Sequence, residues 1–127
     1  MTPHPDPDPL SALAARVVTR LNALDPAWRR GYVRVEVTGD RTLVTASIEK
    51  PNGGEVLDRR RHGSWIRALA APLQRLHRQT RAEDPPFRVA LLMVDSTYRH
   101  MIGFDCNDPT RWRIAEEGRS AGIPWGL

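Results

Sequence analysis

The chain has 127 residues, of which 40% are hydrophobic and 27% are charged, a composition typical of one globular domain rather than of a multidomain or disordered protein. The single cysteine, Cys106, excludes an internal disulfide, and no apolar run approaches the roughly 20 residues that span a bilayer. A net charge of +4 permits nucleic acid or an acidic protein as a partner, although 18 of the 19 basic residues are arginine, a bias that a GC-rich genome also produces.

Residues 1–9, MTPHPDPDP, form a proline-rich leader. A proline at every second position fixes φ and removes backbone donors, which predicts an extended, disordered segment outside the fold. The leader lacks the basic and apolar regions of a signal peptide. Together with the lone thiol, this pattern indicates a cytoplasmic protein.

A helix and a β-hairpin are predicted after the leader. Apolar residues recur with helical spacing from Leu10 to Leu24, and Asp25-Pro26 ends that pattern. The period then changes to two over Tyr32–Val37 and again over Val44–Ile48, with a turn at Gly39-Asp40 between them. The two runs therefore predict an antiparallel hairpin, and Pro51-Asn52-Gly53-Gly54 follows it as a breaker.

The second half repeats the helix-then-hairpin order. A helix is predicted over Ser64–Arg81 with Ser64 as its N-cap; Pro72 either kinks it or lies in the first turn of a second helical segment. The apolar run FRVALLMV at 87–94 predicts a central strand covered on both faces. Alternate residues then share one face of a fourth strand, after a turn at Asp95-Ser96-Thr97: Tyr98, His100, Ile102 and Phe104.

These elements predict a single α+β domain over 10–112 with the order α-ββ-α-ββ. We expect a four-stranded, mainly antiparallel sheet with the helices packed on one face. The apolar residues of 113–127 follow neither a helical nor a strand spacing, so the sequence predicts no structure for this segment.

The motifs of catalysis and metal binding are absent from the sequence. It contains no CxxC, HExxH, P-loop or G-x-S-x-G motif, and its four histidines are scattered. A Cys106 nucleophile would need His100 as a base and Asp105 as an orienting group. Six residues of straight strand place His100 and Cys106 about 20 Å apart, so we expect no catalytic residue, no cofactor and no metal ion.

Five residues are candidates for partner binding. Arg59, Arg60 and Arg61 precede the second predicted helix, where cations oppose the helix macrodipole, so helix stability does not explain them. They suit phosphates or an acidic protein surface. Tyr98 and Trp112 are the aromatic candidates, and Trp112, outside the regular elements, either folds back over the sheet or is offered to a partner.

Short motifs accompany this order of elements. Asp25–Trp28 leads into the first hairpin, Asn52–Gly54 precedes the second helix, and the hairpin Tyr98–Phe104 is followed by the acidic loop Asp105–Asp108. Over roughly residues 10–112 the chain resembles the YezG-like family of bacterial immunity proteins, antitoxins that neutralise polymorphic toxins. The resemblance implies a small cytoplasmic protein without catalytic residues that binds and neutralises one cognate protein toxin. The alternatives are a basic nucleic-acid-binding module and a secretion-type chaperone for an effector.

Overall fold

A computed structural model describes residues 8–127. The predicted leader lies outside the described residues as far as residue 7, and Asp8 then caps the first helix, in which Pro9 is the first residue. The elements, in chain order, are α1 (Pro9–Leu24), β1 (Arg30–Thr38), β2 (Arg41–Lys50), β3 (Gly53–Val56), α2 (Arg59–Arg67), α3 (Ala70–Thr80), β4 (Val89–Asp95) and β5 (His100–Asp105). No helix within residues 8–127 is both long and apolar enough to cross a membrane.

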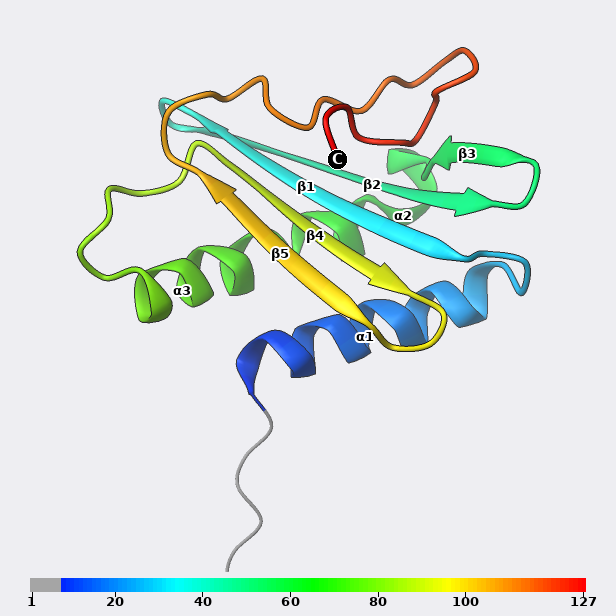
Figure 1. Ribbon diagram of the computed structural model, residues 1–127, viewed down its shortest axis with the longest axis horizontal. Coiled ribbons are helices and arrows are strands. Elements are labelled where there is room, and N and C mark those ends of the chain that lie inside the picture. Colours follow the sequence, from blue (N-terminus) through cyan, green and yellow to red (C-terminus); the bar gives the residue numbers. More distant parts are fainter. Residues whose placement is uncertain (1–7) are drawn as a thin grey trace, which may run out of the picture.

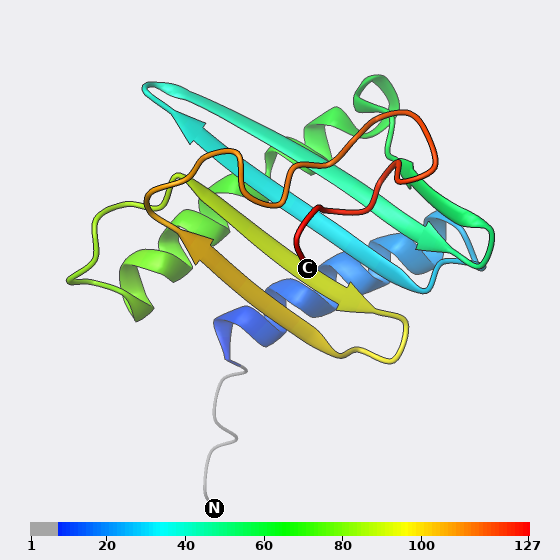
Figure 2. The ribbon, with the colours of Figure 1, turned by 45° about the horizontal axis from the view of Figure 1, so that its top comes forward.

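The molecule has three layers. Its sheet has the order β3-β2-β1-β4-β5, and every neighbouring pair is antiparallel. All three helices lie on one side of the sheet, and the segment after β5, coloured orange to red, crosses the other side (Figures 1 and 2). The α+β class is therefore confirmed.

The sheet has five strands, so the expected count of four is wrong. Lys50 pairs with Gly53 and Ser47 with Val56, which makes β3 a short edge strand where the sequence predicted only a breaker. A Cβ at Gly54 would collide with the carbonyl oxygen of Ala121. Gly54 therefore serves close packing of the later chain segment on β3, a use of glycine in strands that local propensity does not reveal.

The second helical region is two helices rather than one. Asp58, not Ser64, caps α2, because its carboxylate accepts a 2.8 Å hydrogen bond from the Arg60 amide. The helix ends at Arg67, and α3 begins at Ala70, which places Pro72 in the first turn of α3, where its missing N–H costs no helical hydrogen bond. The structure thus confirms that Pro72 lies in the first turn of a second helix and does not kink a single one.

Strand β4 is covered on both faces, as predicted from its apolar run. Ala90 and Leu92 belong to the main core between the sheet and the helices. Leu91 and Val89 belong to a second cluster on the opposite face, together with Tyr32 and Trp112.

The segment after β5 is irregular and is anchored to the sheet at several points. The buried Arg34 side chain donates from Nε to the Arg111 carbonyl oxygen at 3.0 Å and from Nη2 to that of Pro109 at 2.6 Å. The Ser47 hydroxyl donates to the Gly122 carbonyl oxygen at 2.6 Å. A single bridge, Ile114 to Pro124, is the only strand-like pairing within residues 113–127. Residues 113–127 therefore pack against the five-stranded sheet and do not form a separate unit.

Candidate functional site

The turn between β4 and β5 is built around one carboxylate. Asp95 Oδ1 accepts hydrogen bonds from the Thr97 amide at 2.8 Å, the Thr97 hydroxyl at 2.6 Å and the Arg99 amide at 3.0 Å. The Thr97 hydroxyl is the main reason that the pKa of Asp95 lies below its ordinary value, since hydrogen bonds to the ionised form favour it. The turn predicted at Asp95-Ser96-Thr97 is confirmed, and an ionised Asp95 holds it in shape.

Tyr98 lies in this turn in a left-handed backbone conformation. Its φ is +68°, and its amide donates to the Asp95 carbonyl oxygen at 3.0 Å, which closes the turn. Hairpin loops of this kind usually place glycine at the left-handed position. A bulky residue there is an outlier, yet the Tyr98 side chain is 55% exposed, so core packing does not explain it. The prediction that Tyr98 shares a strand face with His100 is wrong, because β5 begins at His100.

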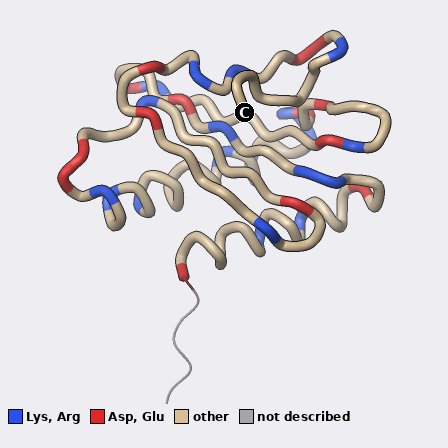
Figure 3. The backbone as a smooth tube through the Cα atoms, viewed as in Figure 1, with Lys and Arg blue, Asp and Glu red and all other residues tan. Residues whose placement is uncertain are grey.

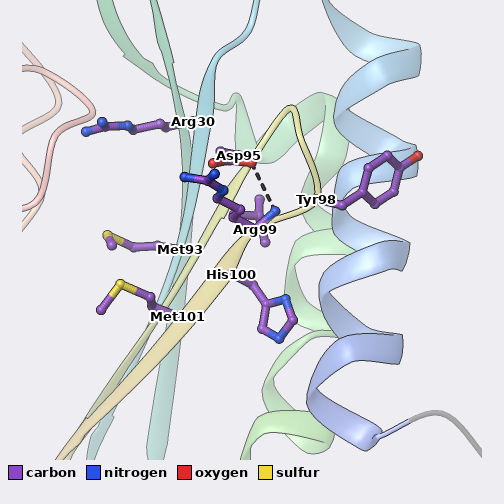
Figure 4. A pocket seen from close by; sticks show the side chains of 8 residues that line it. Arg30, Met93, Asp95, Tyr98, Arg99, His100 and Met101 are labelled. Atoms are coloured by element: carbon purple, nitrogen blue, oxygen red, sulfur yellow. Dashed lines mark hydrogen bonds between the residues drawn. The ribbon is translucent and has the colours of Figure 1, made fainter.

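An open groove of about 570 Å³ surrounds the turn and the free edge of β5. Figure 4 shows Met93, Met101 and Arg30 on the face away from α1, with Tyr98 and His100 on the α1 side. We call this region the hairpin surface, and its lining residues are Arg30, Met93, Val94, Asp95, Tyr98, Arg99, His100 and Met101.

The hairpin surface is apolar and basic. Met101 is 66% exposed, and it pairs across the strands with Met93, so two flexible thioether side chains lie together. Within residues 8–127 neither Arg30 nor Arg99 has a carboxylate partner within ion-pair distance. This arrangement suits an apolar side chain flanked by carboxylates on a binding partner.

The sequence-predicted candidates do not form one site. Arg59, Arg60 and Arg61 lie in the first turn of α2, which packs against β2, whereas Tyr98 lies at the β4–β5 turn. Strand β1 separates β2 from β4 in the sheet. Arg59 is engaged locally, because its Nη2 donates to the Thr45 hydroxyl at 2.9 Å and its Nη1 lies 3.6 Å from a Glu116 carboxylate oxygen.

Trp112 folds back over the sheet and is only 8% exposed. A Cβ at Gly103 would lie 2.8 Å from the Trp112 ring, so glycine at this position of β5 leaves room for the indole. The Arg111 guanidinium lies over the Trp112 ring, 4.3 Å from the ring centroid. Trp112 therefore fixes the last segment to the sheet, and the indole does not contribute to the hairpin surface.

The groups considered for catalysis form hydrogen bonds with other parts of the chain. The Cys106 thiol donates to the Pro85 carbonyl oxygen at 3.3 Å, an acceptor that cannot take up its proton. Asp105 Oδ1 accepts from the Asn107 and Asp108 amides, and these bonds, with the Arg111 side chain, lower its pKa. Within residues 8–127 no three histidine, cysteine or carboxylate side chains are grouped as metal ligands.

Sequence reasoning named Tyr98 but missed its neighbours Arg30, Met93, Arg99 and Met101. Arg30 and Met93 are 63 positions apart in the numbering and meet only because β1 pairs with β4. Met101 carried a local signal, because it is a large apolar residue on the strand face opposite to the predicted apolar face.

Comparison of the chain with models of protein families and with curated protein sequences gives no match in either case.

Proposed function

We propose that this chain is a non-catalytic binding protein that docks one protein partner through the hairpin surface. The observation that carries the proposal is Tyr98, a large aromatic side chain held exposed in a costly backbone conformation beside an open groove. Strain of this kind concentrates at functional sites, and exposed aromatic side chains are enriched among residues that dominate binding energy.

The chemistry of the surface defines the partner segment. Met93 and Met101 form an apolar contact area whose flexible side chains can adapt to a partner. Arg30 and Arg99 have guanidinium groups without carboxylate partners within ion-pair distance in the described part of the chain. The partner segment therefore presents an apolar side chain next to aspartate or glutamate. The resemblance to YezG-like immunity proteins supports a toxin as that partner, neutralised by direct binding in the cytoplasm.

The test is capture from the native host with three tagged forms of the protein. One is the wild type, and the second carries Tyr98→Ala and Met101→Ser. The third carries Leu43→Ser, a control that removes a 46% exposed leucine from β2, near the end of the sheet opposite to the β4–β5 turn. A partner held by the wild type and the control, but lost from the double variant, supports the proposal.

The captured protein is then expressed in another bacterium with and without this chain. An immunity function requires that it arrests growth alone, and that the wild type, but not the double variant, restores growth. Equal capture by all three forms would exclude the hairpin surface as the docking site. A captured protein without toxicity would leave the binding proposal in place and remove the antitoxin part.

A further inference from the structure

The charges of this chain are segregated between its layers. The three helices contain eight of the 19 basic residues and none of the 15 acidic residues, which leaves 11 basic and 15 acidic residues elsewhere. Figure 3 shows blue and no red along α1 and α3 between their ends. A genome-wide preference for arginine explains the residue type but not the absence of carboxylates between the ends of the three helices.

These arginines are also exposed and largely uncompensated. All eight have exposed side chains. Among residues 8–127, Arg59 is the only one of the eight with a carboxylate partner, Glu116. Three of the eight occupy the first turn of α2, where they oppose the helix dipole. Asp58 at the N-cap and Glu116 beside Arg59 offset part of this electrostatic cost, and the other seven arginines have no carboxylate within ion-pair distance in the described chain.

Two grooves connect the arginines across the helices. A groove of about 160 Å³ between α1 and α2 is lined by Arg20, Arg60, Arg61 and Arg67, among other residues. A second groove, about 230 Å³, lies between α1 and α3 and includes Arg16 and Arg75. Because Arg16 and Arg20 are four residues apart, they lie on the same face of α1 and link the two grooves. The result is a basic track across the layer.

The residues of the track indicate which class of anionic ligand suits it: a membrane, an acidic protein or a nucleic acid. The large hydrophobic side chains that are exposed in the described chain all lie outside the helices: Leu43, Tyr98, Met101, Trp125 and Leu127. The α1–α3 groove is also lined by Pro9, Leu13, Pro72 and Leu76, but no large apolar side chain projects from the helices as an anchor for a membrane or for the centre of a protein interface. Trp65 is half-buried with the Arg20 guanidinium 5.6 Å from its ring centroid, so it is not a free platform for stacking single-stranded bases.

We infer that the basic track on the helix layer binds the phosphate backbone of double-stranded nucleic acid without reading its sequence. Nucleic-acid interfaces are much more positively charged than protein interfaces, and planar guanidinium groups suit phosphate oxygens. The track is on the helix layer, whereas the hairpin surface lies at the β4–β5 turn and the edge of β5. The hairpin surface shares no lining residue with the two grooves of the track, so we expect the duplex to bind independently of the protein partner proposed above.

The experiment measures fluorescence anisotropy of a labelled 20-base-pair DNA duplex between about 50 and 200 mM salt, a range over which phosphate contacts weaken strongly. The wild type is expected to bind with a salt slope of about −0.9 per phosphate contacted. The variant with Arg60→Gln, Arg61→Gln and Arg67→Gln should bind more weakly, with the slope reduced by up to about three contacts.

Two controls separate the track from other causes. Arg41→Gln, Arg88→Gln and Arg119→Gln together remove the same charge from exposed positions outside the helices and should leave the slope close to that of the wild type. The Tyr98→Ala, Met101→Ser variant should also bind as the wild type does, which distinguishes this inference from the proposed function. Circular dichroism melting curves must match for all variants that are compared.

Four results would overturn the inference. The first is no saturable binding of the duplex at 50 mM salt at protein concentrations up to about 100 μM, the weak end of ordinary non-specific binding. The second is an equal loss of binding in the two triple arginine variants, which would indicate net charge alone. The third is tighter binding to a single strand of the same length. The fourth is equal competition by polyglutamate or anionic vesicles at matched charge. A duplex RNA probe bound as well as DNA would support backbone recognition.

Discussion

Tyr98 occupies a backbone conformation that glycine adopts at little cost. For an L-residue with a side chain, the left-handed region costs about 1 to 2 kcal/mol. The hydrogen bonds around Asp95 supply the local interactions that hold the turn in place. The Tyr98 side chain is 55% exposed and belongs to neither hydrophobic cluster, so core packing does not compensate for this backbone conformation.

Tyr98→Gly should therefore raise the free energy of unfolding by about 1 kcal/mol, because it removes the steric cost of the positive φ. Tyr98→Ala is the matched control, since it removes the ring and keeps the steric cost. Urea denaturation of both variants checks this. An increase in stability for alanine as large as that for glycine would mean that the ring, not the backbone, is the cause.

His77 is a second residue whose position costs stability. Its side chain is 3% exposed, lies edge-on to Phe87 and Phe104 with ring centroids 5.4 and 4.7 Å away, and leaves Nε2 without a hydrogen-bond partner in the described chain. Burial is the main reason that its pKa is lowered from 6.5, while Asp84 has a smaller opposing effect.

This lowered pKa predicts a pH dependence of stability. As the pH falls through 6.5, the unfolded chain takes up a proton before the folded one does, so His77 destabilises the fold progressively below that pH. His77→Leu should show a smaller loss of stability between pH 7.5 and 5.5 than the wild type. Denaturant titrations at both pH values measure the difference. Identical losses in the two proteins would assign the pH dependence to other groups.

Strand β4 is the element on which both cores depend. Leu91 is 3% exposed and packs in the cluster beneath the last segment, while its neighbours on either side face the helices. Leu91→Asp should unfold the protein, because it buries a carboxylate without a partner. The control is Leu43→Asp on β2, where the side chain is 46% exposed. A native melting transition for Leu91→Asp by circular dichroism would contradict the expectation.

Elements with a strong local period were predictable from sequence, and those formed by distant contacts were not. Helix α1, the β1–β2 hairpin and β4 match their patterns closely. Strand β3 was missed because its glycines resemble a breaker, although Gly54 is adjacent to Ala121 of the distant final segment. The start of α2 was placed too late because Arg59–Arg61 carry no apolar signal, even though Asp58 is a standard cap.

The candidate site likewise combines features that local sequence predicts with features that depend on contacts the pattern does not show. Tyr98 could be named from its position in a hairpin, but its positive φ depends on the Asp95 hydrogen bonds, which the sequence pattern does not specify. Arg30 and Met93 meet through the β1–β4 pairing, a long-range contact that single-sequence periodicity cannot supply. The sequence allowed Trp112 either to fold back over the sheet or to be exposed for a partner. Gly103, nine positions earlier in the numbering, favours the first outcome because it leaves room for the ring.

At the scale of the whole molecule, one buried arginine joins two layers. Arg34 is 5% exposed, pairs with Glu36 at 2.8 Å and donates to two carbonyl oxygens of the last segment. These bonds use the planar fork of the guanidinium, which a lysine ammonium group cannot reproduce. The attachment of the final segment therefore depends on the residue type and not only on its charge.

Arg34→Lys should loosen that segment while the sheet and helices stay folded. Trypsin should then cleave faster after the exposed residues Arg113 and Arg119, as followed by mass spectrometry. The matched control is Arg41→Lys, at an exposed position on β2, which should leave the cleavage rate unchanged. Equal rates for all three proteins would show that Trp112 and Ser47 hold the segment without Arg34.

The anchoring of the final segment also sets an order of events during synthesis. Arg34 bonds to residues 77 and 75 positions later, and Ser47 to one 75 positions later. Contacts of such high sequence separation form late, because a long loop must close before they stabilise anything. Until Trp112 and Ile114 have left the ribosome, the face of the sheet that carries Tyr32 and Leu91 remains uncovered. Aggregation of the nascent chain therefore competes with folding most strongly in this interval.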